Sequence, residues 1–315
     1  MKYLIAIGIP FLIVFSMIPT VIKLSVKYDF TDKPKGRKKH KGAMPLSGGV
    51  AMFIGFFITY FIVLQRQDFE KKWAVFIGAG LILAIGLIDD YYKTKGKEFK
   101  ILPRLIIQLL AAIIVFSSGI SFRGFTNPLT GLYVDLPFVL EFILTITWIF
   151  GVTTVINWSD GMDGLAGGLS FISAITFAAT AIIMAQATSL ILSLLTAGTI
   201  LGFLYYNRYP ARIYMGDSGA NFLGFILSII ALDGAFKQAT LLSLLIPILA
   251  LAVPIFDNVF VILKRYSEGK PVYQADRSQI HFRLQERGLN TRQVVVFIST
   301  ISLLCSILSI ILLLI

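Results

Sequence analysis

Five aspartates stand out in this sequence because each one borders a long apolar run. Asp160 and Asp163 lie in the stretch NWSDGMDGLAGG, and residues three apart share one face once a helix has begun. Asp89 and Asp90 are adjacent in LIDDYYKTKGK, and adjacent carboxylates tend to raise the pKa of one member of the pair. Asp217, in YMGDSGANF, opens a further apolar run. Carboxylates in these positions predict a polar site at one edge of an apolar protein.

The chemistry that these carboxylates favour is the binding of a hard cation. The chain has 2 histidines and 1 cysteine, so neither a histidine cluster nor a cysteine pair is present for zinc or copper. Mg²⁺, or Mn²⁺ in its place, accepts one or two carboxylates and takes its other ligands from substrate phosphates and water. Basic residues that could clamp phosphates lie in the same or neighbouring loops: Lys93, Lys95, Lys97, Arg104, Arg208, Arg212, Arg277 and Arg283. This combination predicts phosphoryl chemistry on a nucleotide-type substrate.

The residues around Asp217 carry a second expectation. A helix that starts there would present free backbone N–H groups, and such groups favour a phosphate or a metal-phosphate pair. The glycines on either side of Asp217 and Ser218 allow a close approach. We therefore expect the start of this helix to face a phosphate.

The elements that must position these residues are membrane helices. Hydrophobic residues make up 57% of the chain, and the mean hydropathy is +0.82. About 20 apolar residues cross a bilayer as a helix. The chain contains about ten such runs, which predict an all-α polytopic integral membrane protein with a single domain over residues 1–315: 3–22, 47–64, 73–88, 101–118, 138–156, 165–185, 188–205, 219–234, 239–263 and 293–314.

The distribution of charge predicts how these helices are oriented. With ten spans, one set of alternate loops carries 21 of the 28 Lys and Arg residues, so the positive-inside rule places that set in the cytoplasm and both termini outside. All five aspartates fall on this cytoplasmic side. The formal net charge of +11 is then explained by topology and attraction to anionic lipid, without a nucleic-acid partner. The first run has no cleavage pattern and reads as a retained span, and Cys305 has no intrachain cysteine partner.

Three further segments carry expectations of their own. The stretch 119–137 combines an Asn-Pro and a Thr-Gly with alternating aromatic residues, which predicts a short external β-hairpin. The stretch SQIHFRLQERGLN predicts a short helix that Ser278 caps and Gly288 ends. Asp257 lies inside the ninth run, where an ionisable group is costly and is expected to face the site or pair with a base.

With these motifs in view, the chain resembles the polyprenyl-phosphate N-acetylhexosamine-1-phosphate transferases, glycosyltransferase family 4. The resemblance covers nearly the whole chain and rests on five motifs in register, one for each predicted cytoplasmic loop: DKPKGRKKHKGAMPLSGG (32–49), DDYYK (89–93), NWSDGMDGLAGG (157–168), NRYPARIYMGDSG (207–219) and DRSQIHFRL (276–284). It implies transfer of a sugar 1-phosphate from a UDP-sugar to a lipid phosphate at the cytoplasmic face of the bacterial plasma membrane. Related enzymes form homodimers, so a homodimer is also expected.

The resemblance also implies a role for each matching residue. Asp217 would be the main Mg²⁺ ligand, and Asp89 and Asp90 would lie beside the lipid phosphate. Lys93 and Arg104 would hold that phosphate. The remaining residues would form the donor site, with Asn157, Asp160 and Asp163 along the nucleotide, Asn207 at the nucleoside, Tyr214 stacked on the uracil and His281 near the pyrophosphate. The catalytic candidates are Asp89, Asp90, Asp217 and His281.

Departures from the family pattern bear on the choice of substrate. The last loop has Gln279, His281 and Phe282 where the family usually clusters histidines, and Thr154 stands in place of a further asparagine. A single remaining histidine argues against the phospho-MurNAc-pentapeptide transferase branch. The RKKH segment followed by PLSGG instead resembles the branch that uses UDP-GlcNAc and undecaprenyl phosphate.

The phospho-MurNAc-pentapeptide transferase branch stays an alternative, and two other classes of protein are alternatives beside it. A secondary transporter also has broken helices and intramembrane acids, but it would place acids near the bilayer midplane, and only Asp257 comes near that depth. A CDP-alcohol phosphotransferase would continue its aspartate motif to an alanine-arginine pair and two later aspartates, and the residues after Asp163 contain neither.

Overall fold

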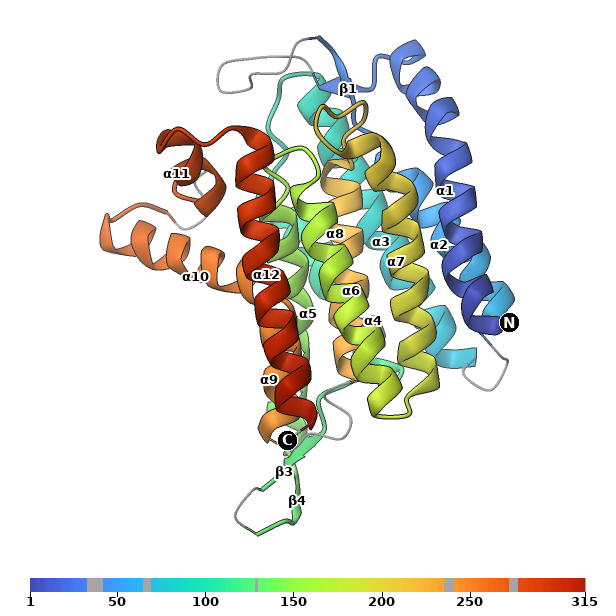
Figure 1. Cartoon of the computed structure of the whole chain (residues 1–315), viewed down its shortest axis with the longest axis vertical. Coiled ribbons are helices and arrows are strands. Elements are labelled where there is room, and N and C mark those ends of the chain that lie inside the picture. Colours follow the sequence, from blue (N-terminus) through green and yellow to red (C-terminus); the bar gives the residue numbers. More distant parts are fainter. Residues whose placement is uncertain (33–41, 65–68, 128–129, 235–240, 272–276, 315) are drawn as a thin grey trace.

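The computed structural model describes residues 1–32, 42–64, 69–127, 130–234, 241–271 and 277–314, and these fold mostly as helices (Figure 1). The helices are α1 (Lys2–Lys27), α2 (Gly48–Val63), α3 (Phe69–Thr94), α4 (Ile101–Ser117), α5 (Phe138–Trp158), α6 (Leu165–Ile183), α7 (Ala187–Asn207), α8 (Gly216–Asp233), α9 (Leu241–Ala250), α10 (Ala252–Ser267), α11 (Ile280–Glu286) and α12 (Thr291–Leu314). Two short antiparallel strand pairs join β1 (Thr31–Asp32) to β2 (Met44–Pro45) and β3 (Gly124–Thr126) to β4 (Tyr133–Asp135). Apolar runs become helices because a helix pairs its backbone polar groups within the segment, away from water.

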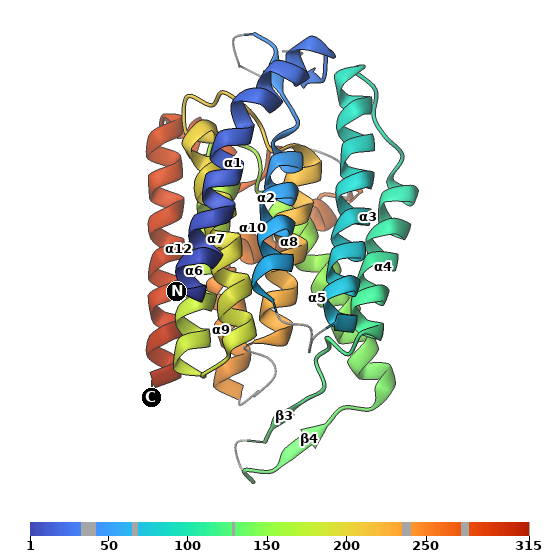
Figure 2. The ribbon, with the colours of Figure 1, turned by 90° about the vertical axis from the view of Figure 1, so that its right-hand side faces the viewer.

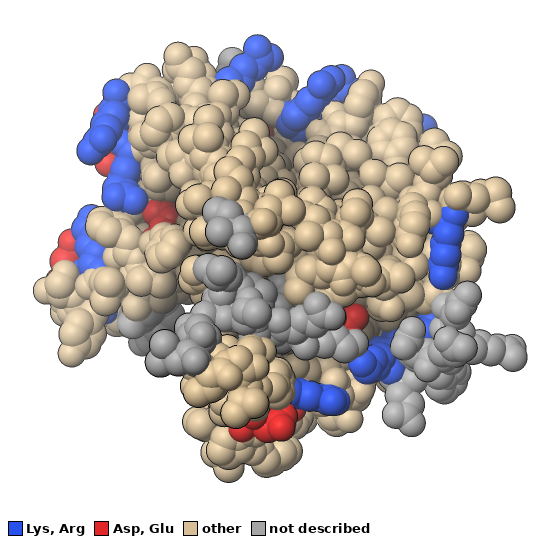
Figure 3. All heavy atoms as spheres, turned by 60° about the horizontal axis from the view of Figure 1, so that its bottom comes forward, with Lys and Arg blue, Asp and Glu red and all other residues tan. Residues whose placement is uncertain are grey.

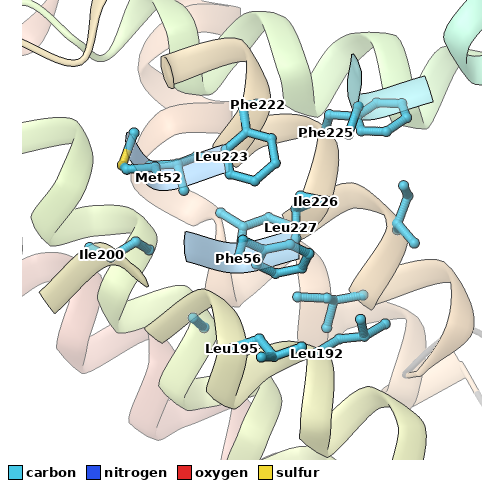
Figure 4. Packing of buried hydrophobic residues seen from close by; sticks show 14 of the residues in the cluster. Met52, Phe56, Leu192, Leu195, Ile200, Phe222, Leu223, Phe225, Ile226 and Leu227 are labelled. Atoms are coloured by element: carbon cyan, nitrogen blue, oxygen red, sulfur yellow. The ribbon is translucent and has the colours of Figure 1, made fainter. Parts of the chain in front are cut away.

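Helix α8 lies in the middle of the bundle, in contact with α2, α3, α5, α6 and α7 (Figure 2). All of its residues are buried except Asp217 and Asp233, one at each end. Figure 4 shows part of the core around it, where Phe56 of α2 packs against Phe222 with ring centroids 5.6 Å apart. The central helix is thus enclosed by protein along its length, and only its ends carry charge.

Helices α3 and α8 run antiparallel, and an ion pair joins them at each end. At one end the Lys71 Nζ lies 3.8 Å from an Asp233 carboxylate oxygen. At the other end the Lys93 Nζ lies 2.6 Å from an Asp217 carboxylate oxygen. These two pairs fix the register of α3 against α8 and place Asp89 and Asp90 beside the start of α8.

Six helices in the described residues are long and apolar enough to cross a membrane: α1, α3 from Lys71, α5, α6, α7 and α12. A seventh is added if α9 and α10 are counted as one broken span, and α2 and α4 are shorter apolar helices. Each predicted run therefore coincides with a helix, or with a pair of helices in one case. The structure supports a polytopic membrane protein, and the number of ten spans stays a prediction.

The predicted run 239–263 does not form one straight helix, because the chain bends by 79° between α9 and α10. Pro254, in the first turn of α10, lacks the N–H that would bond Ala250, and its ring would clash with that carbonyl in an unbroken helix. The Ala250 carbonyl instead accepts a hydrogen bond from the Ser173 hydroxyl of α6 at 2.6 Å. Beyond the bend, α10 projects sideways from the bundle (Figure 1).

The predicted hairpin forms within 119–137, where β3 pairs with β4 between Gly124 and Asp135. It extends from the end of the bundle that lies opposite β1 (Figures 1 and 2). Figure 3 shows this end of the molecule, where uncharged residues cover most of the surface and Lys and Arg side chains are scattered. Its location outside the cell stays a prediction.

Candidate active site

Asp90 connects the end of α3 to the start of α8 through the backbone. Its carboxylate accepts hydrogen bonds from the N–H groups of Asp217 at 2.8 Å and Ser218 at 3.1 Å, and the side chain is fully buried. Gly216 has φ +71°, and a Cβ there would overlap the Asp90 carboxylate. The expectation of free N–H groups at this helix start is therefore wrong, because a buried carboxylate already occupies them.

The neighbouring Asp89 faces two cations together with Asp217. Arg104 Nη1 lies 2.8 Å from an Asp89 oxygen and 3.7 Å from an Asp217 oxygen. Lys93 Nζ lies 2.6 Å from Asp217 and 3.7 Å from Asp89. The Asp89 side chain is 2% exposed and that of Asp217 17%. These four side chains thus lie together, and Asp217 is the more accessible of the two carboxylates.

The donor set of this cluster fits a magnesium ion that substrate phosphates help to bind. Among the described residues, no group of three or more His, Cys, Asp or Glu side chains is placed to hold a metal on its own. Mg²⁺ commonly binds through one or two carboxylates and completes its shell with phosphate and water. The carboxylates of Asp217 and Asp89, both held close to Lys93 and Arg104, match that requirement.

Two loops beside the cluster are tied together by their own side chains. The Asp163 carboxylate accepts the Ala211 N–H at 2.9 Å, which joins the α5–α6 loop to the α7–α8 loop. The Asn207 side chain accepts the Gly164 N–H at 3.0 Å and donates to the Ile213 carbonyl at 2.8 Å. Asn207 is only 2% exposed, and its hydrogen bonds support both loops, while its contact with a nucleoside stays a prediction.

Asp160 lies in the same α5–α6 loop and its charge faces the acidic cluster. Burial raises the pKa of the Asp160 carboxyl to about 7, and the negative charges of Asp217 and Asp90 add to the effect. Lys93 opposes it. Because burial disfavours the ionised carboxylate, a nearby cation or hydrogen-bond donor would stabilise the charged form of Asp160.

His281 projects from α11 against Gly161, between Asp160 and Asp163 in sequence. A Cβ on Gly161 would overlap the imidazole ring, so a glycine is needed for this contact. His281 is 1% exposed, and its Nε2 has no hydrogen-bond partner within the described residues. Burial lowers the pKa of the His281 imidazole to about 4, so the ring is neutral at physiological pH and can donate or accept one hydrogen bond to a ligand.

The other predicted residues divide between the site and its supports. Asn157, at the end of α5, has a buried Nδ2 without a partner in the described part of the chain, which suits a ligand contact. Tyr214 is half-buried, and burial together with the charges of Asp163 and Asp32 raises the pKa of its phenol. Arg277 lies over the Phe282 ring at 5.7 Å. Arg283 is engaged by Asp257 of α10 at 3.1 Å.

Sequence reasoning expected Asp257 to face the site or pair with a base, and Asp257 does pair with Arg283, but the support that it gives to α11 was not predicted. Sequence reasoning offered Ser278 as the cap of α11, but Asp257 accepts the first N–H of that helix, from Ile280. An acid inside an apolar run was the available signal, and its partner lies 23 residues away. The basic segment 33–41, part of the first predicted motif, lies outside the described residues.

The structure thus gives a bundle of apolar helices with acids, bases and a buried histidine at one end. A model of glycosyl transferase family 4 matches residues 72–235, more than half of the chain. The chain is 37% identical over 311 residues to a probable undecaprenyl-phosphate N-acetylglucosaminyl 1-phosphate transferase of Bacillus subtilis (strain 168), covering 99% of this chain and 85% of the relative. The protein belongs to glycosyl transferase family 4.

Two further relatives have names that describe different transferases. The chain is 31% identical over 304 residues to a phospho-N-acetylmuramoyl-pentapeptide-transferase of Clostridium novyi (strain NT), with 91% of this chain and 89% of the relative covered. It is 27% identical over 286 residues to an undecaprenyl-phosphate alpha-N-acetylglucosaminyl 1-phosphate transferase of Escherichia coli (strain K12), with 88% and 75% covered.

Proposed function

We propose that this protein transfers N-acetylglucosamine 1-phosphate from UDP-GlcNAc to undecaprenyl phosphate, or a similar polyprenyl phosphate, and releases UMP. The observation that carries the proposal is the placement of the Asp217 carboxylate at the start of α8, between Lys93 and Arg104. The higher identity to the Bacillus subtilis relative than to the pentapeptide transferase supports the GlcNAc donor.

In the proposed reaction an oxygen of the lipid phosphate attacks the phosphorus that bears the sugar. The new P–O bond joins the lipid phosphate to the sugar phosphate, and the bond to the bridging oxygen of UMP breaks. Lys93 and Arg104 hold the lipid phosphate and keep it ionised, so a general base adds little to a group that already carries negative charge. When bound at Asp217, with Asp89 beside it, Mg²⁺ supplies charge neutralisation for the departing UMP.

The donor would lie across the loops that carry Asp160, Asp163 and His281. His281 and Asn157 would lie beside the donor, since their Nε2 and Nδ2 atoms are buried without a partner among the described residues. Tyr214 provides a ring on which a uracil can stack. The apolar helices behind the cluster provide the surface for a polyprenyl tail.

The experiment that tests this function is UMP release by the purified protein in detergent with polyprenyl phosphate and Mg²⁺. We expect lipid-dependent UMP from UDP-GlcNAc and none from UDP-MurNAc-pentapeptide. UMP from the pentapeptide donor alone would move the protein to the other branch. No UMP from either donor with folded protein would favour another sugar nucleotide or a transport function. The positions of the acids discussed above argue against transport, because all of them except Asp257 lie at helix ends and not near the bilayer midplane.

We also propose that the acidic end of the bundle faces the cytoplasm, that both termini lie outside and that the enzyme forms a homodimer. The concentration of Lys and Arg in the corresponding loops supports the orientation. The orientation is tested in intact cells with the single substitutions Lys95→Cys and Asp135→Cys, each in a variant without Cys305. Only the cysteine at position 135 should react with an impermeant maleimide, and light scattering of the detergent-solubilised protein tests the dimer.

A further inference from the structure

Helix α11 is held in place by contacts outside its own length. It contains seven residues, Ile280–Glu286, and a helix this short is unstable in isolation. It nevertheless fixes His281 so closely against Gly161 that no side chain fits between them. The residues that hold α11 therefore determine where the His281 ring lies.

The first of these contacts is made by Asp257 of α10. Both oxygens of its carboxylate accept the Ile280 N–H, at 2.9 and 3.0 Å. One oxygen also accepts a hydrogen bond from Arg283 at 3.1 Å, and the carboxylate side chain is 11% exposed. Charge-assisted hydrogen bonds to a helix start and to a residue one turn later restrain both the position and the rotation of α11.

The second group of contacts ties this assembly to α5. Asn258, next to Asp257, donates to the Val155 carbonyl of α5 at 3.2 Å. Gln279, just before α11, donates to the Trp158 carbonyl at 2.6 Å. Since α5 leads directly into the loop of Asp160 and Gly161, the same helix end supports both sides of the contact between His281 and Gly161.

We propose that Asp257 is a positioning residue that holds His281 in the donor site through α11. The proposal deepens the proposed function, since the catalytic benefit requires His281 to meet the donor. The structural part of the proposal is that Asp257 controls the position of the His281 ring. This part can be tested whatever the substrate is. It gives the acid inside the ninth apolar run a role that needs no contact with the substrate.

The structural part is tested by the reaction of His281 with diethyl pyrocarbonate, followed by peptide mass spectrometry. The chain has 2 histidines, so His40 serves as an internal reference. In the wild type the buried His281 should react slowly. In Asp257→Ala we expect His281 to react several-fold faster relative to His40, whereas Glu286→Gln, an exposed acid on α11, should match the wild type. Equal rates in folded Asp257→Ala and wild type would overturn the proposal.

The functional part is tested by a double-mutant cycle on UMP release. A displaced catalytic group can cost about 10²-fold in rate, so we expect a kcat loss of that size in Asp257→Ala with a smaller change in KM. In a His281→Ala background the same substitution should cost little more. Fully additive losses would mean that Asp257 acts independently of His281, and they would overturn the proposal.

Asp257→Asn serves as a milder second variant if Asp257→Ala does not fold, since it keeps one acceptor oxygen for Ile280. It should give intermediate values in both assays, and wild-type values in both would count against the proposal. A wild-type enzyme without UMP release would reject the proposed function, whereas the diethyl pyrocarbonate result would still decide the control of His281.

Discussion

The carboxylate of Asp90 accepts the backbone N–H of Asp217 at 2.8 Å, while the Asp217 side chain turns toward Lys93. The two adjacent aspartates of the sequence therefore have separate tasks. Asp90 fixes the start of α8, and Asp89 faces the cations that surround Asp217. The Asp217 carboxylate is thus held from two sides, by Asp90 through its backbone N–H and by Lys93 through its side chain.

Removing the Asp90 carboxylate should reduce stability as well as activity. Loss of a helix cap costs about 0.5–2 kcal/mol, and Asp90→Ala leaves the buried N–H groups of Asp217 and Ser218 unpaired. We expect a lower unfolding temperature in detergent and loss of UMP release. Asp90→Asn keeps one acceptor oxygen, so its unfolding temperature should lie between those of the wild type and Asp90→Ala. An Asp90→Ala protein that unfolds at the wild-type temperature would show that the cap contributes nothing.

The metal requirement should depend on Asp217 and not on the charge of α8 in general. We expect EDTA to abolish UMP release and added Mg²⁺ to restore it. Asp217→Asn should reduce activity by at least about 10²-fold and raise the Mg²⁺ concentration needed for half-maximal activity. The matched control is Asp233→Asn, which breaks the ion pair with Lys71 at the other end of α8 and should retain activity. Activity that persists in EDTA would reject the metal site.

The contact between Gly161 and His281 should tolerate no side chain. Gly161→Ala places a methyl group in the space of the imidazole ring, so the ring must move and UMP release should fall by about 10²-fold. Gly168→Ala is the matched control, because a Cβ there meets only the Ser299 hydroxyl at 3.8 Å. If both variants keep wild-type rates, the position of His281 does not matter for transfer.

The stability of the metal-free protein should depend on pH through Asp160. Its pKa rises from 3.8 to about 7 on folding, so the folded state holds the proton more tightly than the unfolded state. The resulting stabilisation is fully present below pH 3.8 and is lost as the pH rises through about 7. In EDTA, Asp160→Asn should therefore unfold at a higher temperature than the wild type at pH 8, and the difference should shrink toward pH 4. A difference that is independent of pH would contradict this assignment.

Apolar run length and charge predicted that the five aspartates lie on one side, because charged residues between runs must lie near the helix ends, and the resemblance to the family added which bases lie beside them. Asp89, Lys93, Arg104 and Asp217 meet for that reason. The break at Leu251 was not predicted, although Pro254 signalled it, since hydropathy alone ignores where proline interrupts a helix.

Sequence reasoning failed at contacts between residues far apart in the chain. Asp90 accepts a helix-start N–H group from Asp217, 127 residues later, and Asp257 accepts one from Ile280, 23 residues later. A carboxylate looks the same in a sequence whether it binds a ligand or a backbone N–H group. Only the packing of α3 against α8, and of α10 against α11, decides between these two uses.

The enclosure of α8 has a consequence for how the protein is made. Its first two turns contain Asp217, Ser218 and Asn221, and this helix is not among those apolar enough to cross a membrane alone. Polar groups of this kind are costly in lipid until protein surrounds them. We therefore expect α8 to enter the bilayer only in contact with earlier helices of the chain. Membrane insertion of α8 and assembly of the active site would then be a single step of biosynthesis.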